Sequence, residues 1–350
     1  MRYSLNDVQK QSDKKKFTCI STFSGVGGGC LGIKQAGGKI LAVNEFIEEA
    51  QRVYSINFPN TPIIGDDIRN LTGEDIMKVA GIKKGELDLL AGSPPCSSFS
   101  TVGLREEGWG KEKKYSDKRQ RTDDLFFEFS RILKEIQPRF FIAENVAGLT
   151  QGESKNVLGN AQLDMFGKHE DTIYHTLSNT GYNVRYQILN SKDFGVPQSR
   201  ARLIIVGVRK DIDFIYRFPK PTTRLYKTLG EAFKNISNTT KELEECDITP
   251  YAIYPQSKIL KYGEKSQKYF SLIKQDPNKY AGTLTQTAGC LSAASIVHWE
   301  NRKFTVQEAI EIMGFPQDIY LGETYANKIE RLGRAITPII YQKAIEQIVF

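Results

Sequence analysis

Short apolar runs alternate with helix-like segments from about residue 17 to residue 209. Apolar runs bounded by turn residues predict strands at 17–22, 40–43, 62–64, 87–91, 140–143, 182–189 and 203–208. Apolar and aromatic residues near 3.6 spacing predict helices between them, at 30–35, 47–58 and 123–136. Strands that alternate with helices predict an α/β fold, in which a mostly parallel sheet carries helices on both faces.

The pattern changes after Arg209. Residues 211–298 contain five prolines, many lysines and tyrosines, and little clean periodicity, which indicates a smaller irregular domain or a large insertion. Helical spacing returns after Phe304, with Thr305 as the expected N-cap and Gly314 as the stop. The apolar residues 336–350 are expected to pack back on the first domain. The predicted division is therefore 1–210, 211–298 and 299–350.

Composition sets broad limits on what the protein is. The 350 residues are 40% hydrophobic and 25% charged, as in a soluble globular protein with one large and one smaller domain. A net charge of +7 suits a polyanionic partner without requiring one. The five cysteines form no C-x-x-C pair, which argues against a zinc site and a disulfide framework. The polar first 16 residues and the lack of a long apolar stretch predict a cytoplasmic protein without a membrane partner.

Cys96 stands in a loop of unusual stiffness. It follows Pro94 and Pro95, directly after the apolar run 87–91. Proline fixes its own φ and pushes the preceding residue into extended geometry, so this loop holds a thiol at the carboxyl end of a strand. Ligands bind at that edge of open α/β sheets. The segment alone is compatible with a nucleophile and equally with a small buried cysteine in a turn.

A glycine-rich turn opens the first predicted helix. It runs from Phe23 through Gly25 to Gly29 and offers free helix N–H groups to a ligand. Glu45 ends the second strand about twenty residues later, where a carboxylate can accept both ribose hydroxyls of an adenosine cofactor, and Asp67 follows the third strand. NAD, FAD and S-adenosylmethionine suit this pattern equally, and a tight turn without a ligand stays open.

Further motifs stand in a specific chain order with these. They are Asn44-Glu45-Phe46, Asp67-Ile68, Pro94-Pro95-Cys96, Glu144-Asn145-Val146, Gln198-Ser199-Arg200-Ala201-Arg202, Arg302-Lys303-Phe304-Thr305 with Glu308, and Met313-Gly314-Phe315-Pro316. In this order the chain resembles the DNA cytosine-5 methyltransferases, from about residue 17 to 209 and again from 302. The resemblance implies a Rossmann-like S-adenosylmethionine-dependent fold, methylation of carbon 5 of cytosine in duplex DNA, and S-adenosyl-L-homocysteine as the product.

The resemblance also implies roles for single residues. Cys96 would add to carbon 6 of a cytosine flipped out of the duplex, and Glu144 would hold N3 of that base. Arg200 and Arg202 would lie at the active site and favour the thiolate. The residues expected to bind the cofactor are Phe23, Gly25, Gly27, Glu45, Phe46, Asp67, Ile68 and Pro95. No metal is implied.

Residues 211–298 occupy the place of the family's target-recognition domain, so duplex DNA is the expected partner. A bacterial modification enzyme with a cognate restriction endonuclease suits the resemblance. Three positions depart from the family pattern: Ser97 replaces the usual Gln, Ser21 replaces Asp, and Gly333-Arg334-Ala335-Ile336 replaces Gly-Asn-Ser-Val. The alternatives are an RNA cytosine-5 methyltransferase, a catalytically inactive DNA-binding subunit, and a nicotinamide dehydrogenase suggested by the glycine turn alone.

Overall fold

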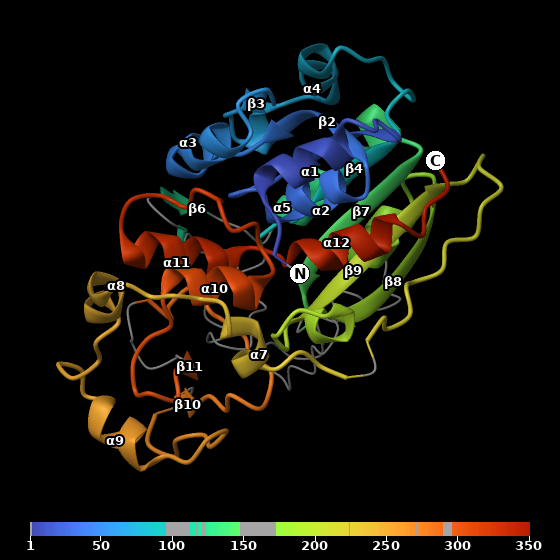
Figure 1. Cartoon of the computed structure of the whole chain (residues 1–350). Helices are drawn as coiled ribbons and strands as arrows, with labels where there is room; N and C mark the ends of the chain where they lie inside the picture. Colours follow the sequence, from blue (N-terminus) through green and yellow to red (C-terminus); the bar gives the residue numbers. More distant parts are fainter. Residues whose placement is uncertain are drawn as a thin grey trace, which may run out of the picture. The chain divides into compact units, whose positions relative to one another are not determined.

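The computed structural model describes residues 2–95, 113–115, 118–120, 124–147, 173–223, 225–269, 272–289 and 296–350. The chain divides into two compact units, each built from several segments (Figure 1). The first, called the sheet unit here, consists of Lys10–Leu189, Ala201–Pro219 and Lys343–Phe350. The second unit consists of Met1–Gln9, Asn190–Arg200 and Lys220–Gln342.

The sheet unit is built on a seven-stranded sheet in the order β3-β2-β1-β4-β7-β9-β8 (Figure 1). The strands are β1 (Phe17–Thr22), β2 (Gly38–Asn44), β3 (Ile63–Ile64), β4 (Leu89–Gly92), β7 (Phe140–Val146), β8 (Tyr182–Asn190) and β9 (Ala201–Arg209). Neighbouring strands from β3 to β7 pair in parallel, and β9 pairs antiparallel to β7. This confirms the mostly parallel sheet that the sequence predicts. All seven predicted strands form, with ends that differ by a few residues.

Alternate strand residues point to opposite sides of this sheet, so both faces carry apolar side chains, and helices cover both. Ile20, Leu90 and Phe141 belong to one apolar cluster together with Phe129 of α5 (Leu125–Ile136). Cys19 and Ser21 of β1 face the other way, toward α2 (Gly28–Gln35), where Ser21 hydrogen-bonds Cys30. Burial raises the pKa of both the Cys19 and the Cys30 thiol. The remaining helices of the sheet unit are α3 (Glu48–Asn57), α4 (Gly73–Ala80) and α6 (Ile173–Ser178).

A short helix replaces the polar lead-in that the sequence suggests for residues 1–16. It is α1 (Leu5–Ser12), and its Val8 is 1% exposed. This two-turn helix has only two apolar residues, Leu5 and Val8, which are too few for a periodic signal. At the other end of the chain, α12 (Pro338–Ile345) leads to Phe350, whose ring stacks on Phe17 with centroids 3.9 Å apart. The last eight residues therefore complete the core of the sheet unit.

The regular elements of the second unit are mainly short helices. The unit also has a small separate apolar cluster of Ile248, Ile253, Leu260, Leu272 and Val297. Its further elements are α7 (Leu229–Phe233), α8 (Thr240–Glu245), α9 (Tyr254–Ile259), β10 (Ile273–Lys274), β11 (Ile296–Val297), α10 (Val306–Met313) and α11 (Tyr325–Arg334). A two-stranded antiparallel pair, β5 (Lys113–Tyr115) and β6 (Lys118–Gln120), lies in the sequence between β4 and α5.

The division of the chain differs from the predicted boundaries at 210 and 298. Residues 299–342 cluster with 220–298, and only Lys343–Phe350 belong to the sheet unit. Helix α10 begins and ends as predicted, with a capping box between Thr305 and Glu308 and a left-handed Gly314 at its C-cap. Local capping signals therefore place the helix correctly, whereas apolar content alone does not reveal which unit it packs against.

Candidate active site

The glycine turn after β1 has left-handed backbone at three positions. Phe23 has φ 54°, Gly25 has φ 53° and Gly27 has φ 92°. This conformation is strained for a non-glycine residue, and such strain concentrates at functional sites. Gly27 serves as the N-cap of α2, and a Cβ added there would stand 2.7 Å from Cε2 of Phe58. Gly27 is therefore required for the packing of Phe58, at the end of α3, against the turn.

Glu45 ties this turn to the end of β2. Its Oε2 accepts a hydrogen bond from the backbone N–H of Gly25 at 2.7 Å, and its Oε1 accepts one from Ile47 at 2.8 Å. Gln51 of α3 donates to the carbonyl oxygen of Glu45 at 2.9 Å. Glu45 is 8% exposed, and two backbone N–H groups fix the orientation of its carboxylate. A carboxylate oxygen can accept more than one hydrogen bond, so a ribose hydroxyl can bind beside these N–H groups.

A pocket opens beside this carboxylate at the carboxyl ends of the strands. It is lined by Phe23, Gly25, Asn44, Glu45, Phe46, Ile47, Asp67, Ile68, Ser93, Pro95 and Leu125, and its empty volume with open solvent included is about 470 Å³. All the predicted cofactor residues line it except Gly27. An acidic residue, an aromatic ring and a glycine turn in one pocket suit the ribose and adenine of an adenosyl group.

Four lining residues were not predicted from the sequence as ligand contacts: Asn44, Ile47, Ser93 and Leu125. Asn44 belongs to the Asn-Glu-Phe motif, and its side chain donates to the carbonyl oxygens of Ile64 and Asp66 at 3.0 and 2.9 Å. It thereby joins the ends of β2 and β3. Leu125 enters the pocket from the start of α5, 58 positions after Asp67 in the sequence, and no local pattern reveals such a contact.

Glu144 and Arg202 form an ion pair on the neighbouring strands β7 and β9. Arg202 Nε lies 2.8 Å from Glu144 Oε1, and the two side chains are 13% and 11% exposed. Burial lowers the pKa of the Arg202 guanidinium, and the charge of Glu144 opposes this shift. The structure thus joins two of the four predicted catalytic residues. The pair places a carboxylate with a fixed cationic partner at the end of β7.

Asn145 connects the end of β7 to the proline loop after β4. Its Nδ2 donates to the carbonyl oxygen of Pro94 at 3.1 Å, and its Oδ1 accepts from the N–H of Val146 at 2.8 Å. Asn145 therefore ties the proline loop to the end of β7. Cys96, the predicted nucleophile, lies outside the described residues.

Arg200 belongs to the second unit and donates to backbone carbonyls within it. Its Nη1 donates to the carbonyl oxygen of Leu284 at 2.9 Å, and its Nη2 donates to those of Gly333 and Ala335 at 2.7 and 2.8 Å. Arg200 is 1% exposed, so these bonds stabilise a fully buried guanidinium. They give Arg200 a structural role that the sequence did not predict. Its predicted catalytic role stays a prediction.

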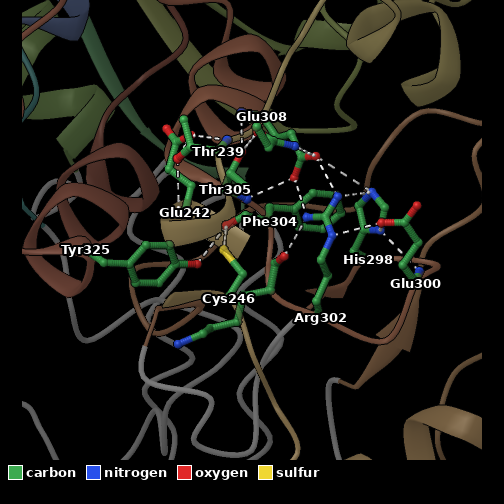
Figure 2. Close-up of polar contacts among 12 residues, drawn as sticks. Thr239, Glu242, Cys246, His298, Glu300, Arg302, Phe304, Thr305, Glu308 and Tyr325 are labelled. Carbon is green, nitrogen blue, oxygen red and sulfur yellow. Dashed lines mark hydrogen bonds and ion pairs between the residues drawn. The ribbon is translucent and has the colours of Figure 1, made fainter. Parts of the chain in front are cut away.

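A second buried polar cluster lies in the second unit (Figure 2). Arg302 donates to both carboxylate oxygens of Glu308 at 2.8 and 2.7 Å, and Glu308 also accepts from the N–H of Thr305. A ring nitrogen of His298 lies 3.0 Å from Arg302 Nη2, and burial together with the Arg302 charge lowers the pKa of His298 to about 2. These contacts hold the start of α10 in place. The late Arg302 to Glu308 motif is therefore a packing device in this structure.

The described part of the chain offers neither a metal site nor a membrane span. Within its ranges, no group of three or more His, Cys, Asp or Glu residues could hold a metal ion. Nor does any helix there have the length and apolar character needed to cross a membrane.

The family model of the C-5 cytosine-specific DNA methylases matches residues 17–349. The chain belongs to this family. Type II methyltransferase M1.HphI of Haemophilus parahaemolyticus is 30% identical over 345 residues, covering 95% of this chain and 86% of that protein. Type II methyltransferase M.Bsp6I of a Bacillus species is 29% identical, covering 94% of this chain and 97% of that protein. The protein is thus a DNA cytosine-5 methyltransferase.

Solved structures support the fold of this methylase. A DNA modification methyltransferase encoded within an E. coli prophage superposes with a TM-score of 0.73 at 21% identity, covering 95% of this chain and 98% of that chain. A mutant of Spodoptera frugiperda DNMT2 gives 0.67 at 19% identity, covering 93% and 97%. At these identities the likeness concerns the fold alone, and it confirms the Rossmann-like arrangement expected for the methylase.

Proposed function

We propose that the methylase transfers a methyl group from S-adenosylmethionine to carbon 5 of a cytosine flipped out of duplex DNA, through a transient bond between Cys96 Sγ and carbon 6. The observation that carries this proposal is the convergence of the Glu45 pocket, the Glu144–Arg202 pair and the Asn145–Pro94 contact at the ends of adjacent strands. The base must leave the stack because carbon 6 cannot be reached inside a duplex.

The cofactor half of the proposal rests on the pocket. S-adenosylmethionine would supply the methyl group from its sulfonium. Glu45 would accept the ribose hydroxyls, Phe46 would stack on the adenine, and Asp67 with Ile68 would meet the adenine edge. Phe23, Gly25 and Pro95 would complete the walls. A nicotinamide dehydrogenase has no use for the Pro-Pro-Cys loop, so the same pocket supports a methyl donor better than NAD.

The chemical half assigns one task to each polar residue. The Cys96 thiolate would add to carbon 6, and the electron pair would move to carbon 5. Carbon 5 would then take the methyl group as the sulfonium S–CH3 bond breaks, which leaves the thioether S-adenosyl-L-homocysteine. Glu144 holds N3 and favours its protonation, which makes the ring accept the thiolate more readily. Arg202 keeps Glu144 in one orientation through the 2.8 Å ion pair. A base then removes the carbon-5 proton, and the returning electron pair expels the thiolate.

Residues 247–274 supply a surface that suits the DNA backbone. This segment, called the lysine–tyrosine lobe here, has five lysines against two acidic residues, and four tyrosines. Lys258, Lys261, Lys265 and Lys268 are exposed. The ammonium groups of Lys258 and Lys268 lie 5.5 Å from the ring centroids of Tyr254 and Tyr269. Lysines displayed in this way would neutralise phosphates, while the tyrosines offer apolar contact.

The reaction is tested with methyl-labelled S-adenosylmethionine and separate pools of duplex DNA and transfer RNA, followed by digestion and separation of nucleosides. We expect label in 5-methyldeoxycytidine and none after Cys96→Ala, with DNA binding retained. Label confined to RNA would reassign the substrate. DNA binding without label at saturating cofactor would favour the inactive-subunit alternative. Label that survives Cys96→Ala would overturn the covalent step.

The DNA surface is tested by the salt dependence of DNA binding. Lys258→Gln with Lys261→Gln should lower the slope of log K against log salt by roughly 0.9 for each phosphate that is no longer neutralised. Lys83→Gln with Lys84→Gln is the matched control, because that exposed pair lies in the sheet unit. Equal slopes for the two double variants would remove the lobe from the interface. Whether a restriction endonuclease accompanies the enzyme is tested with extracts of the cells that produce it. These are assayed for cleavage of unmethylated DNA at the sequence that the enzyme methylates.

A further inference from the structure

Arg69 makes a bridge beside the proposed cofactor pocket. It lies in the short 3-10 turn Ile68–Asn70, where its backbone N–H donates to Asp67 Oδ1 at 3.0 Å and its Nη1 donates to Asp67 Oδ2 at 2.9 Å. On its other side, Nε and Nη2 donate to the two carboxylate oxygens of Asp124 at 2.9 and 2.7 Å. A bidentate guanidinium–carboxylate pair of this kind is strong and directional.

The bridge joins two walls of the pocket that are far apart in sequence. Asp67 lines the pocket directly, and Asp124 is the N-cap residue of α5, whose first residue Leu125 lines it as well. The Arg69 side chain is 26% exposed, against 20% for Asp67 and 35% for Asp124, so water screens these charges only in part. The hydrogen bond to Asp124 and the charge of Asp67 raise the pKa of the guanidinium further.

Asp67 therefore cannot rotate freely. Both of its carboxylate oxygens already accept a hydrogen bond from Arg69, one from the backbone and one from the side chain. A carboxylate oxygen accepts through more than one lone pair, so a ligand N–H can bind at the same time. An ionised carboxylate in a fixed orientation accepts an amino group and repels a carbonyl oxygen at the same place.

We propose that Arg69 is a positioning residue that makes the pocket selective for the 6-amino group of adenine, by holding Asp67 in its acceptor orientation and anchoring it to α5 through Asp124. The inference rests on the proposed function, since it takes the adenosyl group as the ligand of this pocket. Arg69 acts on neither the methyl group nor the target base. Its effect is on which purine the pocket accepts.

The experiment compares two ligands on the full-length protein by isothermal titration: S-adenosylhomocysteine, and S-inosylhomocysteine, in which a carbonyl oxygen replaces the amino group. The wild-type protein should prefer the adenosyl compound. Arg69→Ala should bind the adenosyl compound about tenfold more weakly, because one charge-assisted contact loses its support. The same variant should bind the inosyl compound almost as the wild type does, so the ratio of the two Kd values should fall toward one.

Arg52→Ala is the matched control. Arg52 makes the same bidentate contact, with Glu49 on α3, but both side chains are exposed and neither lines the pocket. It should leave both Kd values unchanged. Arg69→Lys keeps the charge but not the two-sided bridge, and should give an intermediate ratio.

The ratio of Kd values separates positioning from general loosening of the fold. An Arg69→Ala protein that weakens both ligands equally, or keeps the wild-type ratio, would overturn the proposal. If that variant does not fold, Arg69→Lys and Asp124→Asn decide the question by the same ratio. A wild-type protein that binds neither compound would refute the proposed function itself. This result differs from Arg69 variants that keep the wild-type Kd ratio, which would overturn only the role of Arg69.

Discussion

Glu45 offers the sharpest test of how the pocket is built. Its two carboxylate oxygens accept the N–H groups of Gly25 and Ile47 at 2.7 and 2.8 Å. Glu45→Gln keeps the shape but has only one acceptor oxygen, so one of these N–H groups must face an amide donor. A buried N–H left without its acceptor costs about 1–3 kcal/mol, and the other bond loses its charge assistance. We expect the free energy of unfolding to fall by about 2–4 kcal/mol.

Ligand binding should fall as well. The amide cannot accept both ribose hydroxyls in addition to a backbone N–H, so S-adenosylhomocysteine should bind about 10- to 100-fold more weakly. Thermal unfolding measures the first effect and isothermal titration measures the second. Glu49→Gln is the control, because Glu49 makes an exposed ion pair with Arg52 worth at most about 0.5 kcal/mol. A Glu45→Gln protein with wild-type stability and a Kd within about twofold of wild type would contradict this account of the pocket.

Three further outcomes are expected from contacts elsewhere in the molecule. Arg202→Met should lower the free energy of unfolding by about 3–5 kcal/mol, because it leaves the Glu144 carboxylate without its buried cation; denaturant titration with no change would contradict this. Gly333→Ala should unfold the second unit or greatly weaken it, since the new Cβ would stand 2.3–2.4 Å from backbone atoms of Thr285 and Gln286; native hydrogen-exchange protection there would count against the packing described. His298 has a folded pKa of about 2, below its unfolded value near 6.5, so at low pH the unfolded state binds one more proton than the folded state. The free energy of unfolding therefore falls by about 1.4 kcal/mol for each unit that the pH drops below about 6.5. His298→Asn should flatten that part of the pH profile of unfolding, and an unaltered profile would show that another group is responsible.

The parts of the site that the sequence predicted are those with local signatures. The glycine turn, Glu45 and Asp67 each follow directly on a strand, and a residue that ends a parallel strand must lie at the same edge of the sheet as the others. Asn145 lies at the end of β7, and its amide donates to the carbonyl oxygen of Pro94 beyond the neighbouring strand β4. Gly27 shares that local signature but is required for packing against Phe58, because a glycine pattern does not say which neighbour approaches it.

Periodicities and turn residues within single segments predict the fold class, the order of the strands along the chain, the capping of α10 and the residue types that line the pocket. The partners of the buried charges depend instead on how distant segments pack. Arg200 and Arg202 are two residues apart, yet Arg202 pairs with Glu144 while Arg200 donates to carbonyls 84 to 135 positions further along the chain. β9 begins between them, at Ala201, and the chain passes there from one unit to the other. A buried guanidinium must be satisfied by whatever acceptors the packing brings to it, and those acceptors are distant in sequence.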